Sequence, residues 1–343
     1  MNALTSLDNA GNNLKSILPE ALRFRAEHEN AWFTQDNIEL ACQNISQNFL
    51  NGAKLKTWLA HYGILNDAIQ PTTQTIGIVM AGNLPLVGFQ DWLCAWLCGY
   101  RVRIKLSEKD AVLLPVLVKW IEYQTNDHRT EFVEQLKGID LVIATGSNNT
   151  MRYFHYYFDK MPNILRGHRS SVAVLTGKET PAQLLELAKD VFNFFGLGCR
   201  NISKIYLPAG YGIPHLLKTW EVYFPLLQHN KYMNNYEYNL ALYLLNRMPH
   251  FVGDAIVLRE HSDFTSRIAT LHYQYYSTPE EVVKELEANT EKIQAISALS
   301  GSLPTSLTYY PLGVAQCPTL FDYADNVDVM DFLLTHKFKS HES

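Results

Sequence analysis

The feature that most restricts the fold of this chain is an alternation of short apolar segments with longer amphipathic ones, which begins at Thr75. Short runs rich in Val and Ile, such as 101–105, are followed by stretches with helical periodicity, such as 111–124. Strands that are joined through helices lie parallel, with right-handed crossovers. The alternation therefore predicts an α/β fold built on parallel sheets.

The expected elements follow from this pattern. We expect strands at 76–79, 101–105, 140–144, 170–175, 202–207, 255–258 and 268–273. We expect a helix ending at Trp96 and further helices at 111–124, 151–161, 180–195, 214–228, 237–248 and 278–288. The first seventy residues also have a helical pattern, in which Asp36 and Glu39 form a possible capping box that opens a run to His61. Thr180 and Thr278 each precede a proline, which predicts two further N-caps.

Composition and charge exclude several classes of protein. The net charge is -5, and no segment gathers Lys and Arg into a stripe, so we expect no nucleic-acid partner. The apolar stretch 111–121 is interrupted by Pro115 and Lys119 and is shorter than the ~20 residues that span a bilayer, so we expect no membrane insertion. Residues 1–18 carry no signal-peptide pattern. The chain is expected to be soluble and cytoplasmic.

The five cysteines are scattered, which indicates reduced thiols. Cys94 and Cys98 have a spacing that can place two metal ligands on one helix face. No cluster of His or Cys completes such a site, so two buried thiols are favoured and no metal is predicted. A phosphate-binding loop of the GxxxxGK[ST] type is absent, and Gly196-Leu197-Gly198 lacks the third glycine of a dinucleotide fingerprint.

Two segments at strand ends carry groups that suit a substrate or a cofactor. In Gly82-Asn83-Leu84-Pro85, the Asn83 amide can donate to a developing oxyanion, although these residues also suit an ordinary turn. In 105–108, Lys105, Ser107 and Glu108 can hydrogen-bond an adenosine ribose, or simply form a solvated strand end.

Two later segments add a turn and a thiol. Thr145, Gly146 and Ser147 close a strand before a helix, where small residues let a phosphate approach the helix N-terminus; an ordinary turn is the alternative. In Phe195-Gly196-Leu197-Gly198-Cys199-Arg200, two glycines leave the Cys199 thiol open, and Arg200 can help to hold a thiolate. The alternative is an inert core cysteine.

In their order along the chain, these segments resemble the aldehyde dehydrogenase superfamily. Its members carry an Asn-x-Pro segment after a strand, a Lys-Pro-Ser-Glu strand end, a Thr-Gly-Ser turn, a Gly-Gly-Lys-Ser segment and then Gly-x-x-Cys with the nucleophile. The matching residues are Asn83 and Pro85, then Lys105, Ser107 and Glu108, then Thr145 to Ser147, then Gly167, Arg169 and Ser170, and finally Gly196 and Cys199. The resemblance implies two Rossmann-like three-layer α/β/α domains with parallel sheets.

The chain is most similar to one branch of that superfamily, the fatty acyl-CoA reductases, which include the bacterial bioluminescence reductase. The segments 31–33, 167–170 and 321–328 carry this resemblance. It implies an N-terminal helical segment plus an NAD(P)-binding domain over 1–168, a catalytic domain with the nucleophilic cysteine over 169–318, and a segment 319–343 that returns to the first domain. The crossover near Gly167 is the expected boundary.

Two positions depart from the superfamily pattern. Leu165 stands where the aldehyde-oxidising enzymes have a Glu that activates water, and no carboxylate lies between Lys160 and Lys178. Without that base, hydrolysis of a thioester intermediate should be slow, which favours a reductase. Leu106 replaces the usual proline of the second segment.

The resemblance therefore implies a reductase that converts a long-chain fatty acyl-CoA, or another acyl thioester, to the aldehyde. Cys199 is the expected nucleophile and Asn83 the oxyanion donor, together with the Cys199 backbone N–H. Lys105, Ser107, Glu108 and Thr145 to Ser147 are expected to bind NADPH, with NADH as the alternative because Glu108 would repel a 2′-phosphate.

Other interpretations remain open at this point. Cys199 with a nearby His can serve an acyltransferase or a thioesterase, and the chain can also be an inactive scaffold with this fold. His168 is either structural or an aid to proton transfer. A homo-oligomer or an acyl-transferring partner enzyme is implied by the resemblance alone.

Overall fold

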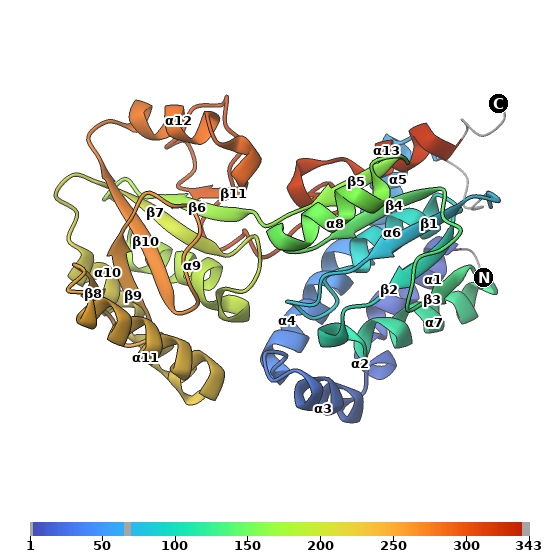
Figure 1. Ribbon diagram of the computed structural model, residues 1–343, viewed down its shortest axis with the longest axis horizontal. Coiled ribbons are helices and arrows are strands. Elements are labelled where there is room, and N and C mark those ends of the chain that lie inside the picture. Colours follow the sequence, from blue (N-terminus) through green and yellow to red (C-terminus); the bar gives the residue numbers. More distant parts are fainter. Residues whose placement is uncertain (1–2, 65–69, 338–343) are drawn as a thin grey trace. The chain divides into compact units, whose positions relative to one another are not determined.

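The computed structural model describes residues 3–64 and 70–337. The chain divides into two compact units: unit 1 comprises Met1–His168 with Pro318–Ser343, and unit 2 comprises Arg169–Cys317. Each unit has one β-sheet with helices packed against it (Figure 1). The predicted α/β fold class is confirmed.

Unit 1 contains a five-stranded sheet in the order β3-β2-β1-β4-β5, and every neighbouring pair is parallel. Its strands are β1 (Thr75–Val79), β2 (Arg101–Lys105), β3 (Thr130–Phe132), β4 (Leu141–Thr145) and β5 (Asn163–Arg166). Val79 at the end of β1 pairs with Lys105 on one side and with Ala144 on the other. The carboxyl ends of β2, β1 and β4 therefore meet at one edge of this sheet.

Helices cover both faces of the unit 1 sheet. They are α1 (Ala3–Asn12), α2 (Leu14–Ile17), α3 (Glu20–Glu29), α4 (Gln35–Asn44), η1 (Ile45–Phe49), α5 (Gly52–His61), α6 (Phe89–Leu97), η2 (Glu108–Asp110), α7 (Leu113–Thr125), α8 (Asn148–Phe158), η6 (Ala324–Asn326) and α13 (Val329–Lys337). Ile76 and Ile78 of β1 belong to the large apolar core shared with α6 and α7. Val142 and Ala144 of β4 pack against α8 on the other face. The unit thus has three layers.

The N-terminal helices differ from the sequence-based expectation. Thr34, not Asp36, caps α4, because the Asn37 N–H donates to the Thr34 hydroxyl. The expected run to His61 is interrupted after η1, where the Asn51 side chain accepts from the Lys54 N–H at 3.1 Å and starts α5. The end of the expected helical stretch, 65–69, lies outside the described residues.

The chain returns to unit 1 after Pro318 through a short segment and α13. The Tyr323 hydroxyl accepts from the Trp58 indole N–H at 2.9 Å, and the Tyr62 hydroxyl donates to Asp328 at 2.6 Å. Met330 and Leu333 of α13 are fully buried in the core of unit 1. This C-terminal segment is therefore part of the unit 1 core.

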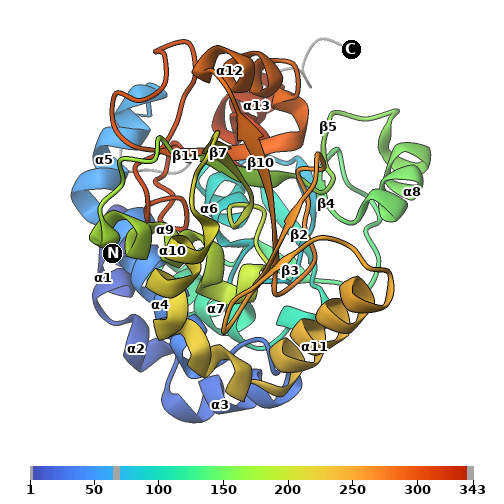
Figure 2. The same cartoon turned by 90° about the vertical axis from the view of Figure 1, so that its left-hand side faces the viewer.

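Unit 2 contains a six-stranded sheet in the order β11-β6-β7-β10-β9-β8. Its strands are β6 (Ser170–Val174), β7 (Ile202–Pro208), β8 (Phe251–Val252), β9 (Val257–Glu260), β10 (Thr270–Tyr276) and β11 (Ile293–Ala298). The parallel strands β7 and β10 lie side by side at the centre (Figure 2). Edge strand β8 is antiparallel to β9, so this sheet is mixed where a wholly parallel one was expected.

The helices of unit 2 also cover both faces. They are α9 (Pro181–Phe192), η3 (Asn193–Gly196), α10 (Ile213–Thr219), η4 (Trp220–Gln228), α11 (Asn230–Leu245), α12 (Pro279–Glu287) and η5 (Thr290–Lys292). The predicted cap at Thr180 is confirmed as a full capping box with Gln183. Thr278 is the N-cap residue before Pro279, as predicted, but its side chain makes no capping hydrogen bond. The Ser277 N–H instead donates to the Glu281 carboxylate at 3.0 Å.

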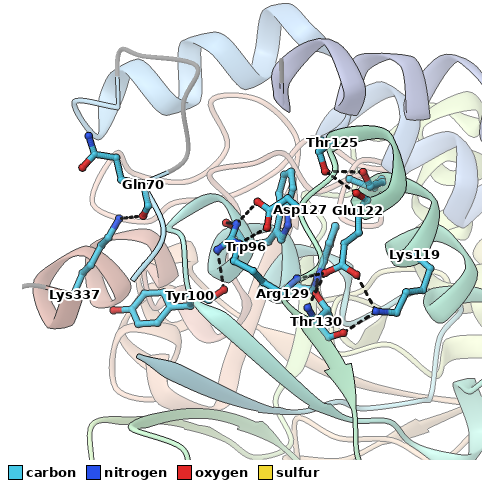
Figure 3. A network of polar contacts seen from close by, with 12 residues as sticks. Gln70, Trp96, Tyr100, Lys119, Glu122, Thr125, Asp127, Arg129, Thr130 and Lys337 are labelled. Atoms are coloured by element: carbon cyan, nitrogen blue, oxygen red, sulfur yellow. Dashed lines mark hydrogen bonds and ion pairs between the residues drawn. The ribbon is translucent and has the colours of Figure 1, made fainter. Parts of the chain in front are cut away.

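Four strands were not expected: β3, β5, β8 and β11. The surroundings of β3 show why such a strand is missed. A buried carboxylate holds β3 in place (Figure 3). Glu122 of α7 accepts from the Arg129 and Thr130 N–H groups at 3.0 and 2.7 Å, and from the Lys119 ammonium at 2.9 Å. These contacts join the end of α7 to the start of β3, and a segment of three residues has no apolar period that reveals it.

Across residues 3–64 and 70–337, no helix is both long enough and apolar enough to cross a bilayer.

Candidate active site

Seven of the predicted site residues lie at one edge of the unit 1 sheet, at the carboxyl ends of three adjacent strands. The loop after β1 carries Asn83, the end of β2 and the turn after it carry Lys105 to Glu108, and the end of β4 carries Thr145 to Ser147. The strand order reverses between β1 and β4. In open α/β sheets, ligands bind beyond the carboxyl ends at such a reversal.

The segments after β1 and β2 touch each other. The Met80 N–H donates to the Lys105 carbonyl at 3.1 Å, which carries the pairing of the strands past their ends. A Cβ atom on Gly82 would lie 2.4 Å from the Ser107 hydroxyl oxygen, so only glycine allows this approach. Asn83 and Ser107 are thereby held in neighbouring loops.

The residues of the second segment have different surroundings. The side chains of Lys105 and Glu108 are exposed, as a ligand-binding role requires. Ser107 is half-buried and caps η2, because its hydroxyl oxygen accepts from the Lys109 N–H at 3.3 Å. The hydroxyl of Ser107 thus has a structural task in the turn.

The third segment forms the start of α8. The Ser147 hydroxyl accepts from the Thr150 N–H at 3.3 Å, so the helix begins at Asn148, earlier than expected. A Cβ atom on Gly146 would lie 2.9 Å from the Phe154 ring, so this turn also needs glycine. The first turn of α8 has no acidic residue, which leaves its N-terminal N–H groups suited to an anion.

Cys199 lies in unit 2, in the loop between α9 and β7. It is half-buried and forms no disulfide, and its backbone carbonyl accepts from the Ser171 hydroxyl at 2.8 Å. Phe194, Phe195 and Gly196 just before it have positive φ angles of 53°, 57° and 73°. Two consecutive phenylalanines in the left-handed region are strained, and such strain persists only where the surroundings enforce it.

Asn201 provides that enforcement. Its carboxamide oxygen accepts from the Gly198 N–H at 2.8 Å, and its amide group donates to the carbonyls of Asp190 and Asn193 at 3.0 and 2.8 Å. The side chain is 2% exposed. One buried amide therefore ties the end of α9 to the loop that carries Cys199.

Three other residues that the sequence analysis singled out are Leu165, His168 and Arg200. Leu165 packs in the apolar cluster beneath α8, and residues 161–177 contain no Asp or Glu. The His168 side chain is exposed, and its backbone N–H donates to the Asn148 side chain at 3.0 Å. The Arg200 guanidinium lies 5.6 Å from the centre of the Tyr310 ring, a cation–π contact.

Cys94 and Cys98 are buried in α6, and burial raises the pKa of both thiols, that of Cys98 to about 12. The Cys98 thiol contacts the sulfur of Met330 at 3.7 Å. Within the described part of the chain, no group of three or more His, Cys, Asp or Glu is arranged to hold a metal ion.

The sequence-based prediction missed two residues that shape these loops, Asn201 and Asp110. Asp110 ends η2, and its carboxylate accepts from the Leu86 N–H at 2.8 Å. Both polar side chains follow a predicted site residue by two positions. That spacing is the only local signal, and it does not reveal that either side chain is buried.

Comparison with solved structures shows the same architecture elsewhere, although no family model and no curated protein matches the chain by sequence. An aldehyde dehydrogenase from Physcomitrella patens, in complex with the reaction product succinate, matches with a TM-score of 0.64 at 9% identity, over 88% of this chain and 73% of that one. The NAD-dependent aldehyde dehydrogenase of Sinorhizobium meliloti gives 0.62 at 13%, over 88% and 71%.

A third structure, the Mycobacterium tuberculosis aldehyde dehydrogenase complexed with NAD⁺, gives 0.61 at 12%, over 88% and 74%. Identities this low establish the fold only, and the roles of individual residues need separate evidence. The structural neighbours belong to the aldehyde dehydrogenase superfamily, and this chain has the aldehyde dehydrogenase-like fold.

Proposed function

We propose that this protein is an NAD(P)H-dependent reductase that converts an acyl thioester, such as a long-chain fatty acyl-CoA, to the aldehyde through an acyl-enzyme on Cys199. The observation that carries the proposal is Leu165, which packs in an apolar cluster where an aldehyde-oxidising relative would have its base. A thioester on Cys199 would then lack that group to activate water.

The edge of the unit 1 sheet supports a nicotinamide cofactor. Exposed Lys105 and Glu108 suit an adenosine ribose, and the glycine turn before α8 suits the pyrophosphate. A bound reduced nicotinamide would supply the hydride that turns the thioester into the aldehyde. We propose NADPH as the donor. NADH is the alternative, because the Glu108 side chain beside the expected ribose would repel the 2′-phosphate of NADPH.

The groups of the chain itself perform the first step. The Cys199 thiolate attacks the acyl carbonyl, the carbon–sulfur bond to coenzyme A breaks, and coenzyme A leaves as a thiol after taking up a proton. The Asn83 amide and the Cys199 backbone N–H would donate to the oxyanion that forms between these events. In the second step the acyl carbon on Cys199, once it has accepted the hydride, becomes a thiohemiacetal. Cleavage of its bond to the Cys199 sulfur releases the aldehyde and regenerates the thiolate.

The acyl carrier can be coenzyme A, a carrier protein or a partner enzyme that hands over the acyl group. The resemblance to the fatty acyl-CoA reductases also supports a homo-oligomer. The five scattered cysteines suit a reducing compartment and support a place in the cytoplasm. Both assignments belong to the same proposal.

The test is a stopped-flow measurement with a long-chain acyl-CoA, in which reduced nicotinamide and free coenzyme A are followed together. NADPH and NADH are compared, and Cys199→Ala serves as the control. We expect nicotinamide oxidation and coenzyme A release in equal amounts, and neither in the variant.

Two other results would contradict the reductase. Release of coenzyme A without nicotinamide oxidation would identify a transferase or thioesterase with Cys199 as nucleophile. Failure to bind cofactor or to become acylated would identify an inactive scaffold.

A further inference from the structure

A buried carboxyl group links the two loops that the proposed function assigns to the oxyanion and to the cofactor. Asp110 is 5% exposed and lies at the end of η2, two residues beyond Glu108. Its Oδ2 atom accepts from the Leu86 N–H at 2.8 Å, and its own N–H donates to the Ser107 carbonyl at 3.1 Å. One residue thus contacts the backbone of both loops.

The loop that Asp110 holds is in a strained conformation. Leu86, three residues after Asn83, has a φ angle of 60°. Left-handed φ costs a residue with a side chain on the order of 1–3 kcal/mol unless the surroundings hold it there. The hydrogen bond from the Leu86 N–H to Asp110, with the Leu86 side chain buried, supplies that hold.

The two loops are also packed without space between them. A Cβ atom on Gly82 would meet the Ser107 hydroxyl at 2.4 Å and the Asp110 nitrogen at 3.2 Å. On the outer side, the Asn30 side-chain amide donates to the Lys109 carbonyl at 3.1 Å, which anchors the turn to the N-terminal helices. A shift of one loop would therefore displace the other.

Keeping a carboxyl group in this place is costly. Burial raises the pKa of Asp110 to about 7. Its second oxygen, Oδ1, is buried and has no hydrogen-bond partner among the residues that the structure describes. An apolar side chain would avoid that cost, so the group is best explained by the backbone N–H that it holds.

We infer that Asp110 is a positioning residue that locks the loop of Asn83 to the cofactor-binding turn Lys105–Glu108, so that one contact sets the geometry of both. The inference rests on the proposed function for the roles of the two loops. The contact of Asp110 with the two loops is itself a property of the fold of unit 1.

The test compares two substitutions of Asp110 that differ in one property. Asp110→Asn keeps an oxygen that accepts from the Leu86 N–H, whereas Asp110→Leu keeps the branched shape and removes the acceptor. Glu122→Gln is the matched control, because it alters another buried carboxylate of unit 1, at the junction of α7 and β3. Thermal unfolding of each variant shows how much stability is lost.

We expect Asp110→Leu to weaken NADPH binding in a fluorescence titration and to slow the release of coenzyme A, each by about tenfold, because displaced catalytic groups lose rate steeply. Asp110→Asn should recover most of both losses. Asn83→Ala should slow acylation alone, and Lys105→Ala should weaken cofactor binding alone. The inference would be overturned if Asp110→Leu weakened only NADPH binding or slowed only coenzyme A release. It would also be overturned if both effects were no larger than in Glu122→Gln.

Amide hydrogen exchange of residues 82–86 separates this inference from the proposed function. Faster exchange in Asp110→Leu than in Glu122→Gln supports the lock even if the wild-type protein transfers no acyl group. Unchanged exchange overturns it even if the reductase is active. If Asp110→Leu does not fold, Asp110→Ala is measured in the same way.

Discussion

Asn201 shows how much a single side chain determines near the proposed nucleophile. Its carboxamide joins the Gly198 N–H to the carbonyls of Asp190 and Asn193, across a loop that contains two strained phenylalanines. Buried polar groups that lose a partner cost about 1–3 kcal/mol each. The Asn201 carboxamide therefore helps to fix the conformation of the Cys199 loop, together with the Ser171 hydroxyl.

Asn201→Ala should lower the free energy of unfolding by about 3 kcal/mol, because it leaves several buried backbone groups unpaired. It should also slow acylation of Cys199 about tenfold, since the loop is no longer held. Urea denaturation and release of coenzyme A measure the two effects. Ser302→Ala is the control: its hydroxyl donates to the Leu299 carbonyl at 2.7 Å within its own turn, and its acylation rate should match wild type.

Asp190 makes stability depend on pH. Burial raises its pKa to about 6, from an ordinary value of 3.8, even though it accepts hydrogen bonds from Gly313 and Ser297. Between these two values the folded protein holds a proton that the unfolded chain has lost. Its contribution to stability is therefore largest at acidic pH and is lost as the pH rises through 6.

The variant Asp190→Asn removes this ionisation and keeps an oxygen acceptor. Relative to wild type, it should gain up to about 3 kcal/mol of stability between pH 4 and pH 7. Urea denaturation across this range gives the difference. A difference that does not change with pH would contradict the assignment.

At the scale of elements, the junction of α7 and β3 depends on Glu122, which is fully buried and accepts two backbone N–H groups and one ammonium. Glu122→Ala should destabilise the protein by about 3–5 kcal/mol, because it leaves the Arg129 and Thr130 N–H groups without their acceptor and removes the partner of the half-exposed Lys119. Glu131→Ala, which removes an exposed pair with Arg103, should cost less than about 1 kcal/mol. Chemical denaturation of both variants tests the contrast, and equal losses would refute it.

At the scale of the whole molecule, unit 1 is completed by a C-terminal segment that packs against helices from the other end of the sequence. The Tyr323 hydroxyl accepts from the buried Trp58 indole and lies 2.8 Å from the Tyr62 hydroxyl. The C-terminal segment therefore stabilises the N-terminal helices and, through α13, also α6.

Tyr323→Phe should lower the free energy of unfolding by about 2 kcal/mol, because the Trp58 indole N–H is left buried and unpaired. The loss should appear in the unfolding of unit 1, followed by hydrogen exchange. Tyr309→Phe in unit 2 is the control, because the Tyr309 hydroxyl accepts from the Gly301 N–H at an exposed site. A loss no larger than that of the control would show that the hydroxyl of Tyr323 does not hold the segment.

Much of the element order could be predicted from local patterns. Strand β2 has the predicted bounds, and the capping box at Thr180 lies where expected, because apolar periodicity and capping side chains act over a few residues. Short β3 and the antiparallel edge strand β8 could not be predicted in this way, since distant contacts hold both strands. The candidate site residues could be predicted from motifs, whereas the supporting roles of Asp110 and Asn201 could not.

By itself, then, the sequence determined the α/β class, the order of most strands and helices, and the residue types that suit a thioester reductase. Only the tertiary structure decided that β2, β1 and β4 lie side by side, and that the carboxyl of Asp110 is buried against the N–H of Leu86. The physical reason is the distance along the chain over which each signal acts. Periodicity and caps are local, whereas strand order and the burial of a polar group depend on contacts between residues far apart in the chain.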